Sequence, residues 1–88
     1  MDFGLIEKAG LTQAEFAQMC GGVSRTTVSL WVTGKFRPHR FIEDMVAERL
    51  TALGAAIERG LLPLKPGTPV SKRPRLIEQA IAAANVPA

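Results

Sequence analysis

The sequence is poor in several residue types, and each shortage excludes a class of protein. The 88 residues include one cysteine, Cys20, one histidine, His39, and no tyrosine. One cysteine cannot close an intrachain disulfide, and one Cys with one His is too few for the usual zinc sites. No alternation of apolar and polar residues lies between hairpin turns. We therefore expect an all-α chain without a metal or cofactor.

Long apolar runs are also missing. No segment approaches the roughly 18 apolar residues that cross a membrane, and residues 1–8 lack the basic and apolar regions of an export signal. Hydrophobic residues make up 47% and charged residues 22%, which is typical of a single globular domain. With a single cysteine as well, we expect a protein of a reducing cytoplasm.

Acidic residues are absent from two long stretches. One runs from Glu15 to Glu43 and the other from Glu58 to Glu78. The first contains Arg25, Lys35, Arg37 and Arg40, and the second contains Arg59, Lys65, Lys72, Arg73 and Arg75. With a net charge of +3, this segregation favours a polyanionic partner.

Capping residues and glycines divide the first half of the chain into short helices. A helix over residues 2–9 ends at Gly10. Thr12 and Glu15 form a capping box that predicts the start of a second helix, which ends at Gly21 and Gly22. Ser24 is an N-cap for a third helix that reaches Val32 or Thr33 and stops at Gly34.

The second half contains a long helix, a linker and a short helix. Apolar residues at steps of three and four predict a helix from about 39 to 59, and they are Phe41, Ile42, Met45, Val46, Leu50, Leu53 and Ile57. Residues 61–73 are rich in proline and indicate an extended basic linker that is not packed. A final helix from Pro74 to about Asn85 carries Leu76, Ile77, Ala80, Ile81 and Ala84 on one side.

Two short helices joined by a glycine turn are the outline of a helix-turn-helix. The segments 11–18, 22–31 and 33–38 resemble the DNA-binding domain of Cro, phage C-type repressors and XRE regulators. The resemblance implies a lambda-repressor-like bundle of about five helices that binds double-stranded DNA in the major groove. It covers residues 11–38.

Helical periodicity separates two faces of the predicted recognition helix. Val28, Trp31 and Val32 share an inner face, so Thr26 and Leu30 lie on the outer face with Thr33, flanked by Thr27 and Ser29. That outer face is short, uncharged and rich in hydroxyls, as suits entry into a major groove.

Arg25 opposes the helix dipole in the first turn, where an acidic residue would stabilise the helix. In the family such first-turn positions read base edges, and arginine can pair with guanine through two hydrogen bonds. The resemblance further implies phosphate contacts from Gln13 and Ser24 and backbone contacts from Lys35 and Arg37. Each of these residues is otherwise an ordinary cap or solvated side chain. Leu30 either touches thymine methyl groups or packs on a protein. The predicted DNA-binding set is Gln13, Ser24, Arg25, Thr26, Thr27, Ser29, Leu30, Lys35 and Arg37.

These observations favour a sequence-specific regulator, a phage or prophage repressor that acts as a homodimer on a palindromic operator. The alternative is an antitoxin or adaptor whose main partner is a protein. An enzyme finds no support, because no nucleophile and base pair is evident, and Cys20 fits a small buried apolar residue.

We expect residues 1–60 to form the DNA-binding domain and residues 61–88 to form an accessory segment for dimer contacts or nonspecific affinity. The dimer prediction rests on the apolar stripe of residues 41–57, which exceeds what three short helices can cover.

Overall fold

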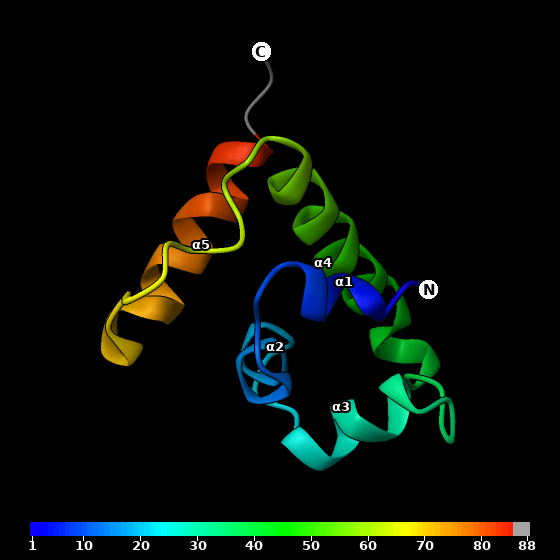
Figure 1. Ribbon diagram of the computed structural model, residues 1–88. Helices are drawn as coiled ribbons and strands as arrows, with labels where there is room; N and C mark the ends of the chain where they lie inside the picture. The colour runs from blue at the N-terminus through cyan, green and yellow to red at the C-terminus, as the bar shows by residue number, and fades with distance from the viewer. Residues whose placement is uncertain (86–88) are drawn as a thin grey trace.

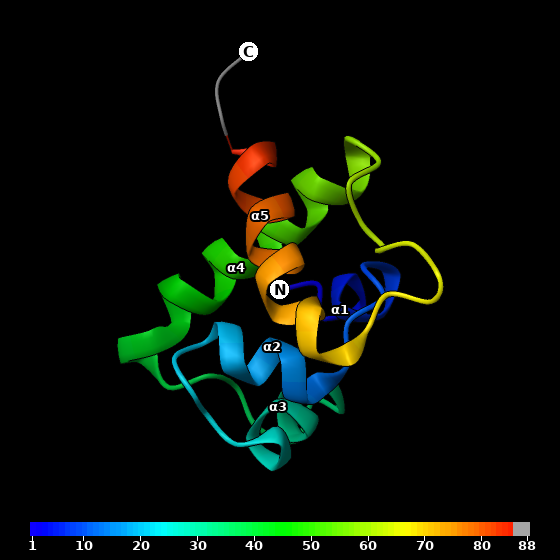
Figure 2. The ribbon, with the colours of Figure 1, turned by 90° about the vertical axis from the view of Figure 1, so that its left-hand side faces the viewer.

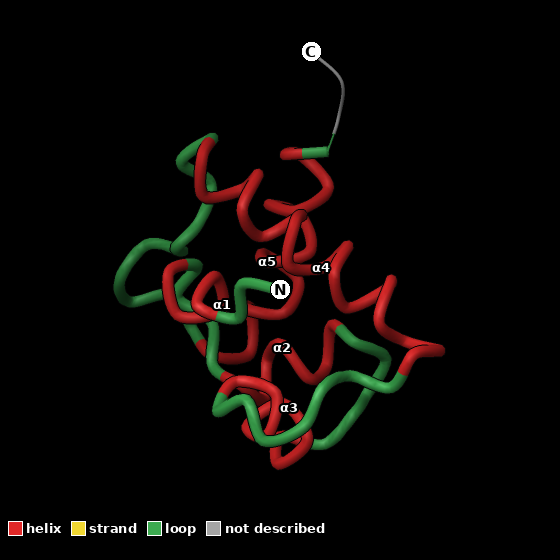
Figure 3. The backbone as a smooth tube through the Cα atoms, turned by 90° about the vertical axis from the view of Figure 1, so that its right-hand side faces the viewer, coloured by secondary structure: helices red, strands yellow, loops and turns green. Residues whose placement is uncertain are grey.

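The computed structural model describes residues 1–85, and this part of the chain is all-helical without strands (Figures 1 and 3). Its helices agree with the predicted segments within about two residues. They are α1 (Gly4–Lys8), α2 (Gln13–Met19), α3 (Arg25–Val32), α4 (Arg40–Glu58), the 3-10 helix η1 (Val70–Lys72) and α5 (Arg73–Ala84). The all-α prediction is confirmed.

Both predicted N-caps form hydrogen bonds. The Thr12 hydroxyl accepts the backbone N–H of Glu15 at 3.1 Å, and the Glu15 carboxylate accepts the N–H of Thr12 at 2.9 Å. The Ser24 hydroxyl accepts the N–H of Thr27 at 3.0 Å. These side chains satisfy backbone donors that the first turn of a helix leaves free, so α2 and α3 begin where the sequence predicted.

Side chains from all five α-helices form one hydrophobic core. In Figure 1, α4 and α5 slope down on opposite sides of the molecule with α2 and α3 below them, and Figure 2 shows α5 in front of α4 and above α2. The largest fully buried side chains are Phe16, Val28, Val46, Leu53 and Ile77. Because Ile77 belongs to α5, the C-terminal helix is part of the same core as the first four.

The apolar stripe of α4 is covered within the chain. α5 packs on α4 through its predicted inner face, where Ile77, Ala80, Ile81 and Ala84 are buried. Val46, Leu50 and Leu53 are buried as well, whereas Phe41 is 81% exposed. The prediction that this stripe exceeds the core is therefore wrong for Val46, Leu50 and Leu53, because α1 and α5 pack on α4 within the chain. Ile42, Met45 and Ile57 are half-buried against the core.

Residues 61–73 also differ from the prediction of an unpacked linker. Leu62 is buried and belongs to the core, and Leu64 packs against it. The hydroxyl of Thr68 donates to the carbonyl of Lys65, which folds the segment into a turn. Arg73 is the first residue of α5. The leucines explain the difference, since their burial outweighs the proline-rich composition that suggested an extended chain.

Residues of both predicted segments, 1–60 and 61–88, thus contribute to one core. The last three residues of the second segment lie outside the described residues. Among residues 1–85, no helix has the length and apolar content that crossing a bilayer requires.

Candidate nucleic-acid interface

The turn between α2 and α3 is built on two consecutive glycines. Gly21 and Gly22 have φ angles of +83° and +86°, a conformation that other residues rarely adopt. A Cβ atom at either position would meet nothing within 4 Å. The positive φ angles, and not a lack of space, are therefore what favours glycine there. This turn brings α2 and α3 into contact with each other, as the prediction of a helix-turn-helix requires.

Two of the three side chains predicted for the inner face of α3 are buried. Val28 and Trp31 are buried, whereas Val32 is 41% exposed. The placement of Val32 on the inner face is therefore wrong. It is the last residue of α3, and there it lines an open groove beside Phe3 and Gly4 of the N-terminal segment.

The first turns of α2 and α3 meet at a shallow hollow. Thr12, Gln13, Ala14 and Arg25 line this hollow, which has a volume of about 330 Å³. Gln13 is the first residue of α2, and Arg25 is the first residue of α3 and is exposed. The structure thus brings together two predicted site residues that are twelve positions apart in the sequence.

Hydroxyl groups follow along α3. Ser24 and Thr27 hydrogen-bond through their side-chain oxygens at 2.7 Å, in addition to the capping bond. Thr26 is exposed, whereas Thr27 and Ser29 are half-buried. Leu30 is half-buried too, so it presents only part of its side chain to a partner. The outer face of α3 remains uncharged beyond Arg25.

The loop after α3 carries the remaining predicted contacts. Lys35 and Arg37 are exposed on either side of Phe36, which is 64% exposed. At the start of α4, the exposed ring of Phe41 lies 4.9 Å from the His39 ring, and the Arg40 guanidinium lies 5.3 Å from its centre. The sequence reasoning missed this exposure, because it assigned Phe41 to the core stripe by periodicity and gave Phe36 no role.

Comparison with known families decides what this arrangement is. A helix-turn-helix family model matches residues 5–39, from α1 to the N-cap of α4. Residues 5–39 are a helix-turn-helix domain. The predicted resemblance to Cro, phage C-type repressors and XRE regulators is confirmed. No curated protein and no solved structure matches the chain.

The helix-turn-helix family consists of DNA-binding domains and not of enzymes. Burial raises the pKa of the Cys20 thiol at the end of α2 to about 11, so this side chain is a neutral, buried thiol at pH 7. Within the described residues, His, Cys, Asp and Glu side chains form no group of three that could hold a metal ion.

Proposed function

We propose that this DNA-binding regulator reads a palindromic operator as a homodimer and acts as a phage or prophage repressor in the bacterial cytoplasm, at the nucleoid. The observation that carries the proposal is the exposed surface of the helix-turn-helix. Arg25 and Thr26 are exposed, Thr27 and Ser29 are half-buried, and the chain has no acidic residue between Glu15 and Glu43 to repel a phosphate backbone.

The proposed contacts fall into two groups. Arg25 reads guanine through two hydrogen bonds, while Thr26, Thr27, Ser29 and Leu30 line the same groove. Phosphates are bound by Gln13 and Ser24 at the helix N-termini and by Lys35 and Arg37 in the following loop. This division follows docking of a recognition helix by its N-terminal end.

Dimerisation has a different basis from the one that the sequence suggested, since α5 covers the stripe of α4. Exposed apolar side chains remain at the corner of α3 and α4, where Val32, Phe36 and Phe41 lie. Such side chains commonly mark a protein interface. A twofold pair would place two recognition helices about 34 Å apart, one turn of DNA.

The same aromatic side chains are what favours the alternative, an antitoxin or adaptor that binds another protein. Selection of binding sites from random duplex DNA separates the two functions. Enrichment of a palindrome supports the dimeric repressor. If no sequence is enriched over the input pool, the main partner is not an operator.

Sedimentation of the protein with and without the selected duplex tests the dimer itself. We expect two protomers on each palindrome. One protomer on each duplex at high protein concentration would contradict the dimer while leaving DNA recognition intact.

A further inference from the structure

An ion pair between Arg73 and Glu15 joins the C-terminal helix to the first turn of the helix-turn-helix. We propose that Arg73 is a positioning residue for DNA binding, which holds the first turn of α2 in place for Gln13 without touching DNA itself. The inference rests on the proposed function, because it assigns Gln13 to a phosphate.

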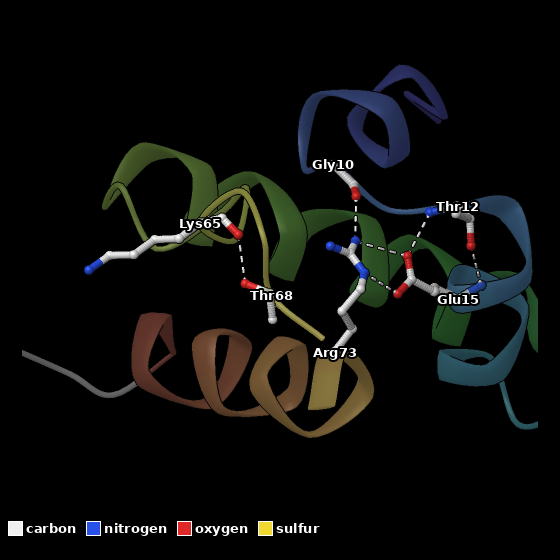
Figure 4. Close-up of polar contacts among 6 residues, drawn as sticks. All are labelled: Gly10, Thr12, Glu15, Lys65, Thr68 and Arg73. Carbon is white, nitrogen blue, oxygen red and sulfur yellow. Dashed lines mark hydrogen bonds and ion pairs between the residues drawn. The ribbon is translucent and has the colours of Figure 1, made fainter. Parts of the chain in front are cut away.

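The Arg73 side chain is held by three hydrogen bonds (Figure 4). Its Nε donates to Oε2 of Glu15 at 2.7 Å, and its Nη2 donates to Oε1 of Glu15 at 3.0 Å and to the carbonyl of Gly10 at 2.6 Å. Paired bonds of this kind fix orientation as well as distance. Arg73 and Glu15 are 21% and 16% exposed, so water shields the pair only partly.

The Glu15 carboxylate also accepts a hydrogen bond from the backbone at the start of α2. Its Oε1 also accepts the backbone N–H of Thr12, which closes the capping box of α2. One carboxylate therefore joins the start of α2 to the start of α5. Through this carboxylate, Arg73 is linked to Thr12 and Glu15, which lie on either side of Gln13.

The C-terminal segment also holds the turn before α2 by a steric contact. Gly10 has a φ of +73°, and a Cβ atom at this position would lie 2.6 Å from Cβ of Pro63. Pro63 thus lies directly against the turn whose carbonyl Arg73 binds. Two contacts from residues 61–73 act on one short turn, which makes this segment a support for α2.

The supported turn belongs to the proposed DNA surface. Thr12 and Gln13 line the same hollow as Arg25. A shift of this turn changes the spacing between Gln13 and Arg25, and hence the fit to a phosphate and a base of one duplex. Loss of Arg73 also leaves the Glu15 charge uncompensated near that phosphate.

Replacement of Arg73 by methionine in the full chain tests the proposal, with Arg75→Met as the matched control. Arg75 is exposed on the same helix, and its replacement removes the same charge. Affinity for the selected duplex is measured at a temperature at which both variants are folded. We expect Arg73→Met to weaken binding about 5-fold or more, which is the lower end of typical coupling between sites. Arg75→Met should change it by less than about 2-fold, since it removes only one exposed charge.

A double-mutant cycle with Gln13→Ala separates positioning from general stabilisation. If Arg73 acts through Gln13, the Gln13→Ala change costs much less affinity in the Arg73→Met background than in the parent. Additive effects would mean that Arg73 only stabilises the fold. Equal losses from Arg73→Met and Arg75→Met would show that only total charge matters. Either result overturns the proposal.

Amide hydrogen exchange gives a readout that needs no DNA. We expect the Thr12 amide to exchange faster in Arg73→Met than in Arg75→Met, because the carboxylate that accepts this N–H loses its anchor. If the parent protein binds no duplex, the proposed function fails, and the exchange rates still decide whether Arg73 holds the turn. Equal rates in the two variants would show that it does not.

Discussion

The two basic regions of the chain look alike in sequence and are used differently in the structure. In residues 25–40, the side chains of Arg25, Lys35 and Arg37 are exposed on the helix-turn-helix and its following loop. In residues 59–75, Arg73 binds Glu15 and Gly10, and Arg59 donates to the carbonyl of Ala83 at 3.1 Å. The named side chains of the first region are exposed to solvent, whereas part of the second region holds the chain together.

A charge pattern in the sequence does not by itself show what its basic side chains bind. A stretch without acidic residues favours a polyanion only where its cations are left to solvent. Arg73 is neutralised by Glu15, which lies 58 residues earlier in the sequence, so no local pattern could have revealed the pair. Substitutions in each region test whether the two sets of basic side chains have these different roles.

The largest effect is expected from the core that α5 shares with the helix-turn-helix. Replacing the buried Ile77 by alanine should lower the free energy of unfolding by about 2 to 5 kcal/mol, because it leaves a cavity in that core. The exposed Val70 is the control, and Val70→Ala should stay within about 0.5 kcal/mol. Unfolding in denaturant, followed by fluorescence of the single tryptophan, Trp31 on α3, measures both.

Because Trp31 lies on α3, its fluorescence reports on the unfolding of the helix-turn-helix. If the Ile77→Ala protein shows an unchanged transition at Trp31, the C-terminal helix unfolds on its own. The second basic region would then be an appendage and not a support, and the contrast between the two regions would fail.

The next effect concerns recognition by the first region. Arg25→Ala should cost about 1 to 3 kcal/mol on the selected duplex and relax the preference at one base pair of each half-site. Titration on the selected and on a scrambled duplex measures the difference. The same loss on both duplexes would place Arg25 on a phosphate, so the base-reading role would be wrong.

The Arg73 and Glu15 pair makes a smaller, pH-dependent contribution to stability. The hydrogen bond from Arg73 lowers the pKa of Glu15 below its ordinary value of 4.5. The charged form is therefore favoured in the folded state. The resulting stability is fully present above pH 4.5 and is lost as the pH falls through the lowered pKa.

Glu15→Gln tests this contribution, since glutamine keeps the capping oxygen and removes the charge. We expect a loss of about 1 kcal/mol at pH 7, as for a partly exposed ion pair. That loss should shrink on acidification below pH 4.5. Glu78→Gln, at an exposed position of α5, is the control. A loss that is independent of pH would show that the charge of Glu15 does not matter.

Local chemistry explains which features could be predicted from the sequence. The capping box at Thr12, the N-cap at Ser24 and the glycine turn each depend on residues within a few positions of one another. All of them appear in the structure where the sequence placed them. The helix-turn-helix outline followed from these local signals.

Long-range packing explains the errors. Periodicity placed Phe41 in the core, although its ring is 81% exposed and lies beside His39 and Arg40. Composition made residues 61–73 an unpacked linker, although Leu62 reaches the core from there. Which apolar residue finds a partner depends on where α5 docks, and no short window of sequence contains that information.

The smallest effect compares one exposed lysine from each region. Lys35→Ala should weaken binding to all duplexes alike and reduce the magnitude of the salt slope by about 0.9 for each lost phosphate contact, or about twice that for a dimer. Lys72→Ala should change the slope less, because Lys72 lies outside residues 5–39, which match the helix-turn-helix family. Titrations of both variants at several salt concentrations give the two slopes. An equal or larger change at Lys72 would mean that the second region also binds the DNA backbone. The proposal that only the first region contacts DNA would then be wrong.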